Sequence, residues 1–193
     1  SGSAYIFVRS GTSWSQQAKL VASDDAAGEF FGVNVSISGD YAIAGAPVNQ
    51  YSVPAYQLRD DDGGDGSGSA YIFVRSGTSW SQQAKLEASD AAAGDNFGGA
   101  VSISGNNVIV GAPFNDDSAT NSGSAYIYKR YGASWRIDKK VVANDPAQDD
   151  YYGISVAIDN DYIAVGAPRK DASATDQGII YVIERKALVD AGS

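Results

Sequence analysis

Short apolar runs separated by polar turns recur along the whole chain. One unit shows the pattern: FGGAVSIS, a Gly-Asn-Asn turn, VIVGA ending at a proline, a polar loop, AYIYKR, another turn and a final run opened by Trp. Val, Ile, Tyr and Phe fill the runs, which is typical of β-strands, and no stretch keeps a helical period. The unit therefore predicts four antiparallel strands, at Phe97–Ser104, Val108–Ala112, Ala125–Arg130 and Trp135–Ala143.

This unit is repeated. Residues 1–20 read SGSAYIFVRSGTSWSQQAKL, and residues 67–86 are identical to them. A third copy, SGSAYIYKRYGASW, begins at Ser122, and a weaker one, GIIYVIER, begins at Gly178. The matching glycines Gly2, Gly68, Gly123 and Gly178 lie 66, 55 and 55 positions apart. A period of this size with four strands per unit is typical of the blades of an all-β propeller.

Two short motifs keep step with the repeat, and we expect structural roles for both. Glycine after an aromatic residue lets neighbouring backbones approach, the aromatic ring fills the wedge between blades, and proline ends the second strand. A tryptophan recurs in the fourth strand, where we expect blade-to-blade packing, with a ligand platform as the alternative. The residues are Phe31, Gly32, Phe97, Gly98, Tyr152 and Gly153 for the first motif, Pro47, Pro113 and Pro168 for the Gly-Ala-Pro motif, and Trp14, Trp80 and Trp135.

An aromatic-glycine pair followed by Gly-Ala-Pro resembles FG-GAP repeats, the units of the propeller of integrin α-subunits, and the tract GSAYIF…W…AKL is closer to a bacterial-style variant. The resemblance covers essentially the whole chain. It implies a β-propeller in secreted or surface proteins that bind a protein or a glycan. Integrin-type blades often carry a calcium loop between strands one and two. Here those connections are tight turns, such as Ser38-Gly39-Asp40, which are too short to wrap a cation, so the usual calcium site is not carried over.

The repeat divides the chain into four segments. Residues 1–30 hold strands three and four of an incomplete blade, 31–96 a blade with an inserted acidic loop at 48–66, 97–151 a second blade, and 152–193 an incomplete blade with the C-terminal edge. About three blades are fewer than the 4–8 of a closed propeller. We therefore expect either further repeats of a larger parent chain or association with copies of itself, in which an N-terminal strand pair completes a neighbour's blade to form a ring or a filament.

Composition excludes several kinds of site. The chain has no Cys and no His, so disulfides, thiolate or imidazole metal ligands and Ser-His or Cys-His catalytic couples are excluded. The net charge of −9 and the pI of about 4.3 argue against nucleic acid and anionic lipid as partners. No apolar run approaches the ~20 residues of a transmembrane helix. We expect an extracellular or cell-surface location.

Most of the 23 acidic residues fall in the four-to-one and two-to-three connections, which share one face of a blade. A recurrent Asp-x4-(Asp/Glu) pair precedes each aromatic-glycine motif and can either chelate calcium or cap its own turn. The inserted loop holds an Asp-rich run that either binds a hard cation or is simply solvated. The candidate calcium ligands are Asp24, Glu29, Asp90, Asp95, Asp145, Asp150, Asp60, Asp62 and Asp65, and the candidate ligand-binding residues are Asp60, Asp61, Asp62, Asp65, Asp116, Asp117, Asp171 and Asp176.

Three classes of function remain. The first is an extracellular binding or adhesion module that recognises a protein or glycan through its acidic loop face, with calcium as a possible cofactor. The alternative is a self-assembling structural subunit of an extracellular filament or ring. An enzyme is disfavoured, because two catalytic carboxylates need one with a raised pKa, and these acids lie in solvated loops. Catalysis by a separate domain of a secreted enzyme remains open.

Overall fold

Thirteen strands make up the fold in the computed structural model, which describes residues 2–24, 29–47, 66–171 and 177–185. They form an edge pair, β1 and β2, then a first blade, β3 to β6, a second blade, β7 to β10, and a third blade, β11 to β13, all antiparallel. The bounds are β1 Ala4–Ser10, β2 Ser13–Leu20, β3 Val35–Ser38, β4 Tyr41–Ala46, β5 Ser69–Ser76, β6 Ser79–Leu86, β7 Ala100–Ser104, β8 Asn107–Ala112, β9 Ser124–Tyr131, β10 Ser134–Val141, β11 Ser155–Ile158, β12 Tyr162–Ala167 and β13 Ile179–Glu184.

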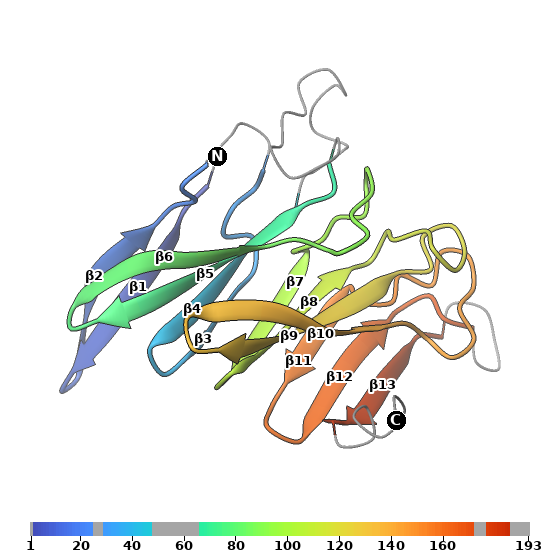
Figure 1. The fold of residues 1–193 in the computed structure, drawn as a ribbon. Helices are drawn as coiled ribbons and strands as arrows, with labels where there is room; N and C mark the ends of the chain where they lie inside the picture. The colour runs from blue at the N-terminus through green and yellow to red at the C-terminus, as the bar shows by residue number, and fades with distance from the viewer. Residues whose placement is uncertain (1, 25–28, 48–65, 172–176, 186–193) are drawn as a thin grey trace.

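These sheets follow one another side by side in chain order, as a partial propeller (Figure 1). Strand one of each blade lies against strands one and two of the preceding blade: β7 contacts β3 and β4, and β11 contacts β7 and β8. The fourth strands of neighbouring blades are also in contact, because β6 touches β2 of the edge pair on one side and β10 of the second blade on the other. The all-β, four-stranded propeller fold predicted from the repeat is confirmed. The described residues contain no helix with the length and hydropathy needed to cross a membrane.

Two predicted strand boundaries of the second blade are wrong: its fourth strand was expected to end at Ala143, but β10 ends at Val141, and the start of its first strand differs more. The first strand of the second blade was expected from Phe97, but the Phe97-Gly98-Gly99 segment forms a turn and β7 begins at Ala100. The Gly99 N–H donates to the Asn96 carbonyl at 3.1 Å, which closes that turn, and Gly98 has a positive φ of 90°. The aromatic and the glycines therefore belong to the junction between blades rather than to the sheet.

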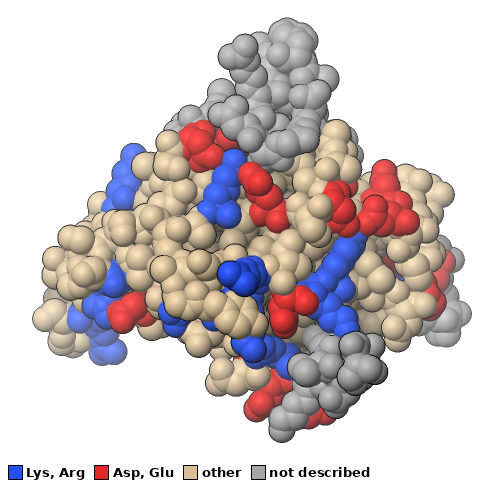
Figure 2. Space-filling view, viewed as in Figure 1, with Lys and Arg blue, Asp and Glu red and all other residues tan. Residues whose placement is uncertain are grey.

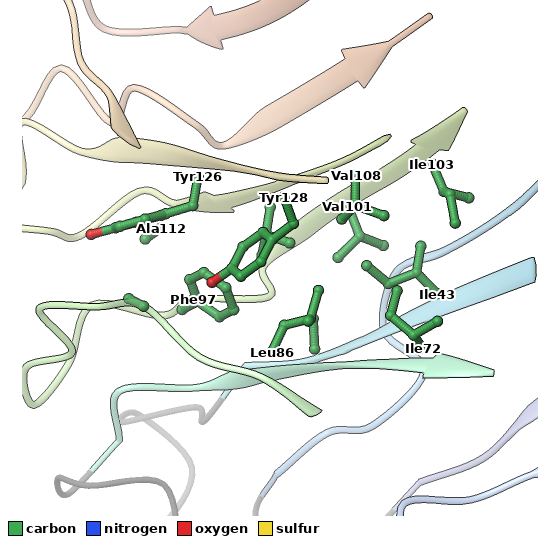
Figure 3. Packing of buried hydrophobic residues seen from close by; sticks show 13 residues of the cluster. Ile43, Ile72, Leu86, Phe97, Val101, Ile103, Val108, Ala112, Tyr126 and Tyr128 are labelled. Atoms are coloured by element: carbon green, nitrogen blue, oxygen red, sulfur yellow. The ribbon is translucent and has the colours of Figure 1, made fainter. Parts of the chain in front are cut away.

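The hydrophobic core lies between the blades. Around Phe97, which is fully buried, side chains of the second blade meet Ile43, Ile72 and Leu86 of the first blade (Figure 3). The Phe97 ring packs edge-on against the rings of Tyr126 and Tyr128, with centroids 5.4 and 6.2 Å away. Phe31 and Tyr152 are equally buried at the neighbouring junctions. Burying these apolar faces against one another supplies the main driving force for stacking the blades.

Glycine sets the distance between blades. A Cβ placed on Gly111, in the Gly-Ala-Pro motif of the second blade, would lie only 1.9 Å from the carbonyl oxygen of Gly153 at the start of the third blade. At the preceding junction, a Cβ placed on Gly45 would lie 2.0 Å from the carbonyl oxygen of Gly98. Any side chain at these positions would push the backbones apart, so the two motifs interlock across each junction.

Tryptophan joins the outer strands. The Trp80 indole N–H donates to the side-chain oxygen of Gln17 at 2.8 Å, and Trp135 donates to Gln83 at 2.9 Å. Both glutamines occupy a β-bulge, since the pairing of strands three and four skips each of them. Trp14 differs from the prediction of blade-to-blade packing: it is 66% exposed, because no blade precedes the edge pair among the described residues.

We predict that Gly111→Ala destabilises the protein by about 3 kcal/mol, because the new methyl group overlaps the Gly153 carbonyl and the two blades must separate. Gly77→Ala is the matched control. Gly77 has a positive φ of 62° and open space around it, so alanine there costs only about 1 kcal/mol of backbone strain. Urea unfolding followed by circular dichroism measures both, and equal losses would contradict the interlocking role of Gly111.

Candidate functional site

The long connections gather on one side of the blades. This loop face comprises residues 21–24, 29–34, 87–99, 113–123, 142–154 and 168–171, which link strand four to strand one and strand two to strand three. In Figure 1 these loops lie along the upper and right-hand side of the molecule, away from the tight turns. Figure 2 shows Asp and Glu side chains spread along that side with Lys and Arg between them. The acidic face is therefore interrupted by cations that the sequence analysis did not place.

Lys140 is the most highly connected of these cations. It lies on β10, and its ammonium group donates to Asp90 at 2.6 Å, to the side chain of Asn115 at 3.1 Å and to Asp117. Asp90 also accepts a hydrogen bond of 2.7 Å from the Tyr126 hydroxyl. Burial alone would raise the pKa of Asp90, but the bonds from Lys140 and Tyr126 outweigh it, so the pKa of this carboxyl is lowered. Lys140 thus ties two loops to strand four.

The neighbouring junctions repeat this arrangement. Lys85, at the position equivalent to Lys140, lies 2.8 Å from Asp24 and 3.4 Å from Glu87. At the third blade the cation comes from a different strand connection: Lys170 lies 3.1 Å from Asp150 and 3.5 Å from Asp145. Burial would lower the pKa of Lys170, but these carboxylates raise it, so it stays charged although its side chain is buried.

In two of the three pairs the second carboxylate caps its own turn. An Asp95 oxygen accepts from the Ala92 N–H at 3.2 Å and from the Asn115 amide at 3.1 Å, and Asp150 accepts from the Ala147 N–H at 2.8 Å. Asp95 is buried, and this burial raises the pKa of its carboxyl despite both hydrogen bonds. Glu29 is likewise buried. These acids therefore stabilise the loops from within.

Calcium would have to displace these donors at the predicted pairs. In the described parts of the chain, no group of three or more acidic side chains is arranged to hold a metal ion. A lysine ammonium or a backbone N–H lies where the pairs were expected to bind calcium. Five acids of the inserted loop and the last two-to-three connection lie outside the described residues, and their calcium and ligand roles stay predictions: Asp60, Asp61, Asp62, Asp65 and Asp176.

Between the second and third blades, two further acids are held at the surface. Asn121 donates its backbone N–H to Asp116 at 2.6 Å and its side-chain amide to Asp149 at 2.8 Å. The bond from Asn121 contributes most to lowering the pKa of Asp149, so this carboxyl stays ionised. Asp116 is exposed, and Asp149 is half-buried. The loops of adjacent blades thus present two carboxylates from one network, which we call the seam.

Aromatic residues flank the seam. The rings of Phe114 and Tyr151 pack edge-on with centroids 5.4 Å apart, and the Arg169 guanidinium lies 4.9 Å from the Tyr151 ring. Tyr151 has a φ of 54°, in the left-handed region that a bulky residue rarely adopts. Phe30 and Asn96, at the equivalent positions, share this backbone conformation. The sequence analysis missed Tyr151 and Asn121. In the sequence, both residues could have been singled out as positions of the repeat at which the residue type changes from one unit to the next.

The opposite side, which we call the turn face, is held by arginines. Arg75, on strand three, forms an ion pair with Asp40 in the β3–β4 turn, and Arg130 bonds to Asn106 in the equivalent turn. Arg185 follows the same pattern with the Asn160 carbonyl at 2.9 Å. The tight turns are therefore braced within each blade.

Comparison with known families gives three consecutive matches to the FG-GAP repeat, at residues 14–73, 80–128 and 135–183. Each match starts at a tryptophan and ends in strand three, so it spans strand four of one blade and strands one to three of the next. The search of curated proteins found no match.

We predict opposite effects from two substitutions of the same kind in one loop. Asp90→Asn removes the charge that faces Lys140 and should lower the stability by about 1 kcal/mol at pH 7, allowing for solvent screening. Asp95→Asn keeps an oxygen for the Ala92 and Asn115 donors but removes a buried charge, so stability should be unchanged or rise. Thermal unfolding of the two variants beside the parent chain tests this, and a large loss from Asp95→Asn would refute the capping role.

The differences in stability between each variant and the parent chain should disappear in acid. The lowered pKa of Asp90 means that its contribution is complete above the ordinary aspartate pKa of ~3.9 and is lost as the pH falls through its folded-state value. The raised pKa of Asp95 means that its ionised form costs stability at neutral pH, a cost that is absent below pH ~3.9. Unfolding free energies of the three proteins should converge as the pH is lowered from 7 to below the folded-state pKa of Asp90. A constant offset would assign the effects to something other than charge.

Proposed function

Because the chain belongs to the FG-GAP repeat family, we propose that it is a non-catalytic extracellular binding module whose loop face recognises a protein or glycan at a surface. FG-GAP repeats occur in adhesion and binding domains of extracellular proteins. The observation that carries the proposal for this chain is the seam, where Asn121 holds two carboxylates at the surface and an aromatic pair packs beside them.

The charge of the seam favours a cationic partner. Asp116 accepts a hydrogen bond from the Asn121 backbone, and Asp149 accepts from the side-chain amides of Asn121 and Gln148 and from the Tyr151 hydroxyl. In the described part of the chain no ammonium group is bonded to either acid, and the nearby Arg169 guanidinium acts on Asp149 only through its charge, which helps to lower the pKa of that carboxyl. Asp90 and Asp150, by contrast, have lysines that already neutralise them. A ligand with Lys or Arg side chains can pair with the two seam carboxylates without displacing a cation that stabilises the fold. A basic segment of a protein is therefore the partner that the seam fits best, and a glycan fits through the flanking ring of Tyr151.

Binding rather than catalysis is supported by the state of the acids. Catalysis by two carboxylates needs one of them protonated near neutral pH. Among the described carboxyls with a resolved shift, Asp95 has a raised pKa and is buried and bonded within its turn, whereas the half-buried Asp149 has a lowered pKa. The seam therefore supplies fixed negative charge, which suits electrostatic recognition.

We predict that the chain binds a peptide of alternating Lys and Ser, and that Asp116→Asn with Asp149→Asn weakens this binding at least about tenfold, since two charge-assisted pairs are lost. Asp161→Asn with Glu184→Gln removes the same charge from exposed positions on the turn face and should leave the affinity within about twofold. Fluorescence titration at low salt, with and without calcium, measures the affinities. An equal loss of affinity in both double variants would mean that only the net charge of the protein matters, and would contradict a specific role of the seam.

A parallel glycan-array experiment separates the two ligand classes. Retention of a glycan by the parent chain and its loss in a Tyr151→Ala variant would assign the seam to glycan recognition. A requirement for calcium would place the ion in the ligand contact.

A further inference from the structure

The outer hairpins of the repeat, which consist of strands three and four, differ in charge although they pair alike. The hairpin β9–β10 carries five Lys or Arg side chains and one acid. The hairpins β1–β2 and β5–β6 each carry one Arg, one Lys and no acid. In a chain with a net charge of −9, positive charge is therefore concentrated on the outer hairpin of the second blade.

Two of the added cations lie directly opposite each other. Arg136 on β10 is the cross-strand partner of Lys129 on β9. At the same register position the other hairpins pair a valine with a serine, Val74 with Ser81 in the first blade and Val8 with Ser15 in the edge pair. Like charges directly opposite each other destabilise a strand pair. Because the hairpin also forms around a Val-Ser pair, the stability of the blade does not account for these two cations.

These two cations also lack counter-ions. Lys140 and Arg130, on the same hairpin, are held by acceptors of their own blade or its loops. Among the described residues, neither Lys129 nor Arg136 lies within ion-pair distance of a carboxylate, and both are exposed. Both instead lie near the ring of Tyr131, with the Lys129 ammonium 5.7 Å and the Arg136 guanidinium 6.0 Å from its centroid. Their charge is therefore available to a ligand.

The ring belongs to the same surface as the two cations. Tyr131 follows Lys129 by two positions on β9, so both side chains lie on the same face of the strand. The ring is 53% exposed and replaces a serine, since Ser76 and Ser10 occupy the equivalent positions. Three neighbouring positions thus differ together from the other hairpins, with a change from Val, Ser and Ser to Lys, Tyr and Arg. We call Lys129, Tyr131 and Arg136 the rim patch.

A neighbouring blade does not cover this surface. In the first blade, which has the complete second blade beside it, the equivalent Ser76 and Ser81 are exposed and Val74 is half-buried. The outer end of the hairpin therefore projects beyond the wedge between blades. The rim patch stays accessible whether or not a fourth strand lies beside the third blade.

We propose that the rim patch binds an acidic saccharide, a sugar chain that carries carboxylate or sulfate groups. The Arg136 guanidinium can hold such an anion through two parallel hydrogen bonds, and the Lys129 ammonium adds a second charge beside it. The exposed ring of Tyr131 offers an apolar face to the C–H groups of the sugar and a hydroxyl to its polar edge. An acidic peptide could use the two cations but has no comparable use for the ring. The inference goes beyond recognition at the seam and does not rest on it.

Calorimetric titration of the whole chain at low salt tests the proposal. The probe is an oligogalacturonate, in which every sugar carries a carboxylate, beside dextran sulfate and an uncharged dextran of the same length. We expect the two anionic saccharides to bind and the uncharged dextran not to bind. Affinity should fall as salt is added, since the cations are exposed to solvent. A parent chain that binds neither anionic saccharide would overturn the proposal.

Restoring the residues of the first blade gives the decisive variant. Lys129→Val with Arg136→Ser recreates the Val-Ser pair of β5–β6 and should weaken oligogalacturonate binding at least about tenfold. Arg9→Gln with Lys19→Gln removes the same two charges from exposed positions of the edge pair and should leave the affinity within about twofold. Circular dichroism establishes that both variants are folded. Similar losses in the two variants would assign binding to overall charge and reject the rim patch.

Tyr131→Ser separates a saccharide from an acidic peptide. It restores the residue of the first blade and should weaken oligogalacturonate binding at least about threefold, while binding of an oligo-glutamate peptide changes by less than about twofold. The parent chain should also bind the saccharide more tightly than the peptide at equal length. Tighter binding of the peptide, or an affinity for the saccharide that Tyr131→Ser leaves unchanged, would show that the patch recognises charge alone and would overturn the saccharide assignment.

Discussion

The spacing between blades is the constraint on which the other contacts in this protein depend. Gly111 lies directly against the Gly153 carbonyl, and Gly45 lies against that of Gly98, so neighbouring blades approach to backbone contact at each junction. At this distance the aromatic residue before the glycine fills the wedge, a tryptophan reaches the bulge of the preceding strand four, and a lysine reaches the preceding loop. A wider junction would leave each of these groups without its partner. Stability therefore resides in the junctions more than in the individual sheets.

The loop face divides its acids between two tasks. Asp90 and Asp150 form ion pairs with lysines and hold the loops to the blades, while Asp116 and Asp149 accept hydrogen bonds from Asn121 at the surface. The division follows from position. The acids nearest the sheet are desolvated and need a cation or an N–H donor, whereas those at the loop tips remain hydrated. Recognition can therefore change at the tips without loss of the ties beneath them.

Sequence alone predicted the fold because period, strand pattern and glycine motifs all indicated the same architecture. It placed four strands in each blade and the acids on one face. It placed the start of β7 too early, because Phe97 and Gly98 are followed by residues typical of a strand. Their role is a contact between blades, which the local sequence does not show. It also missed the lysines, because Lys140 is distant in sequence from Asp90 and Asp117 and only the stacking of blades brings them together. Trp14 shows the converse: an identical sequence acquires a different environment when its neighbour is absent.

The phase of the repeat has a consequence for how such proteins change in length. Each family match runs from strand four of one blade to strand three of the next, and the glycine contacts join one matched unit to the following one, since Gly111 lies in the second match and Gly153 in the third. Duplication or deletion of one unit in the gene would therefore leave every junction with matched halves, and the chain would gain or lose a blade without creating a new interface. Blade number in this architecture can thus vary by recombination, while the chemistry of each junction is inherited whole.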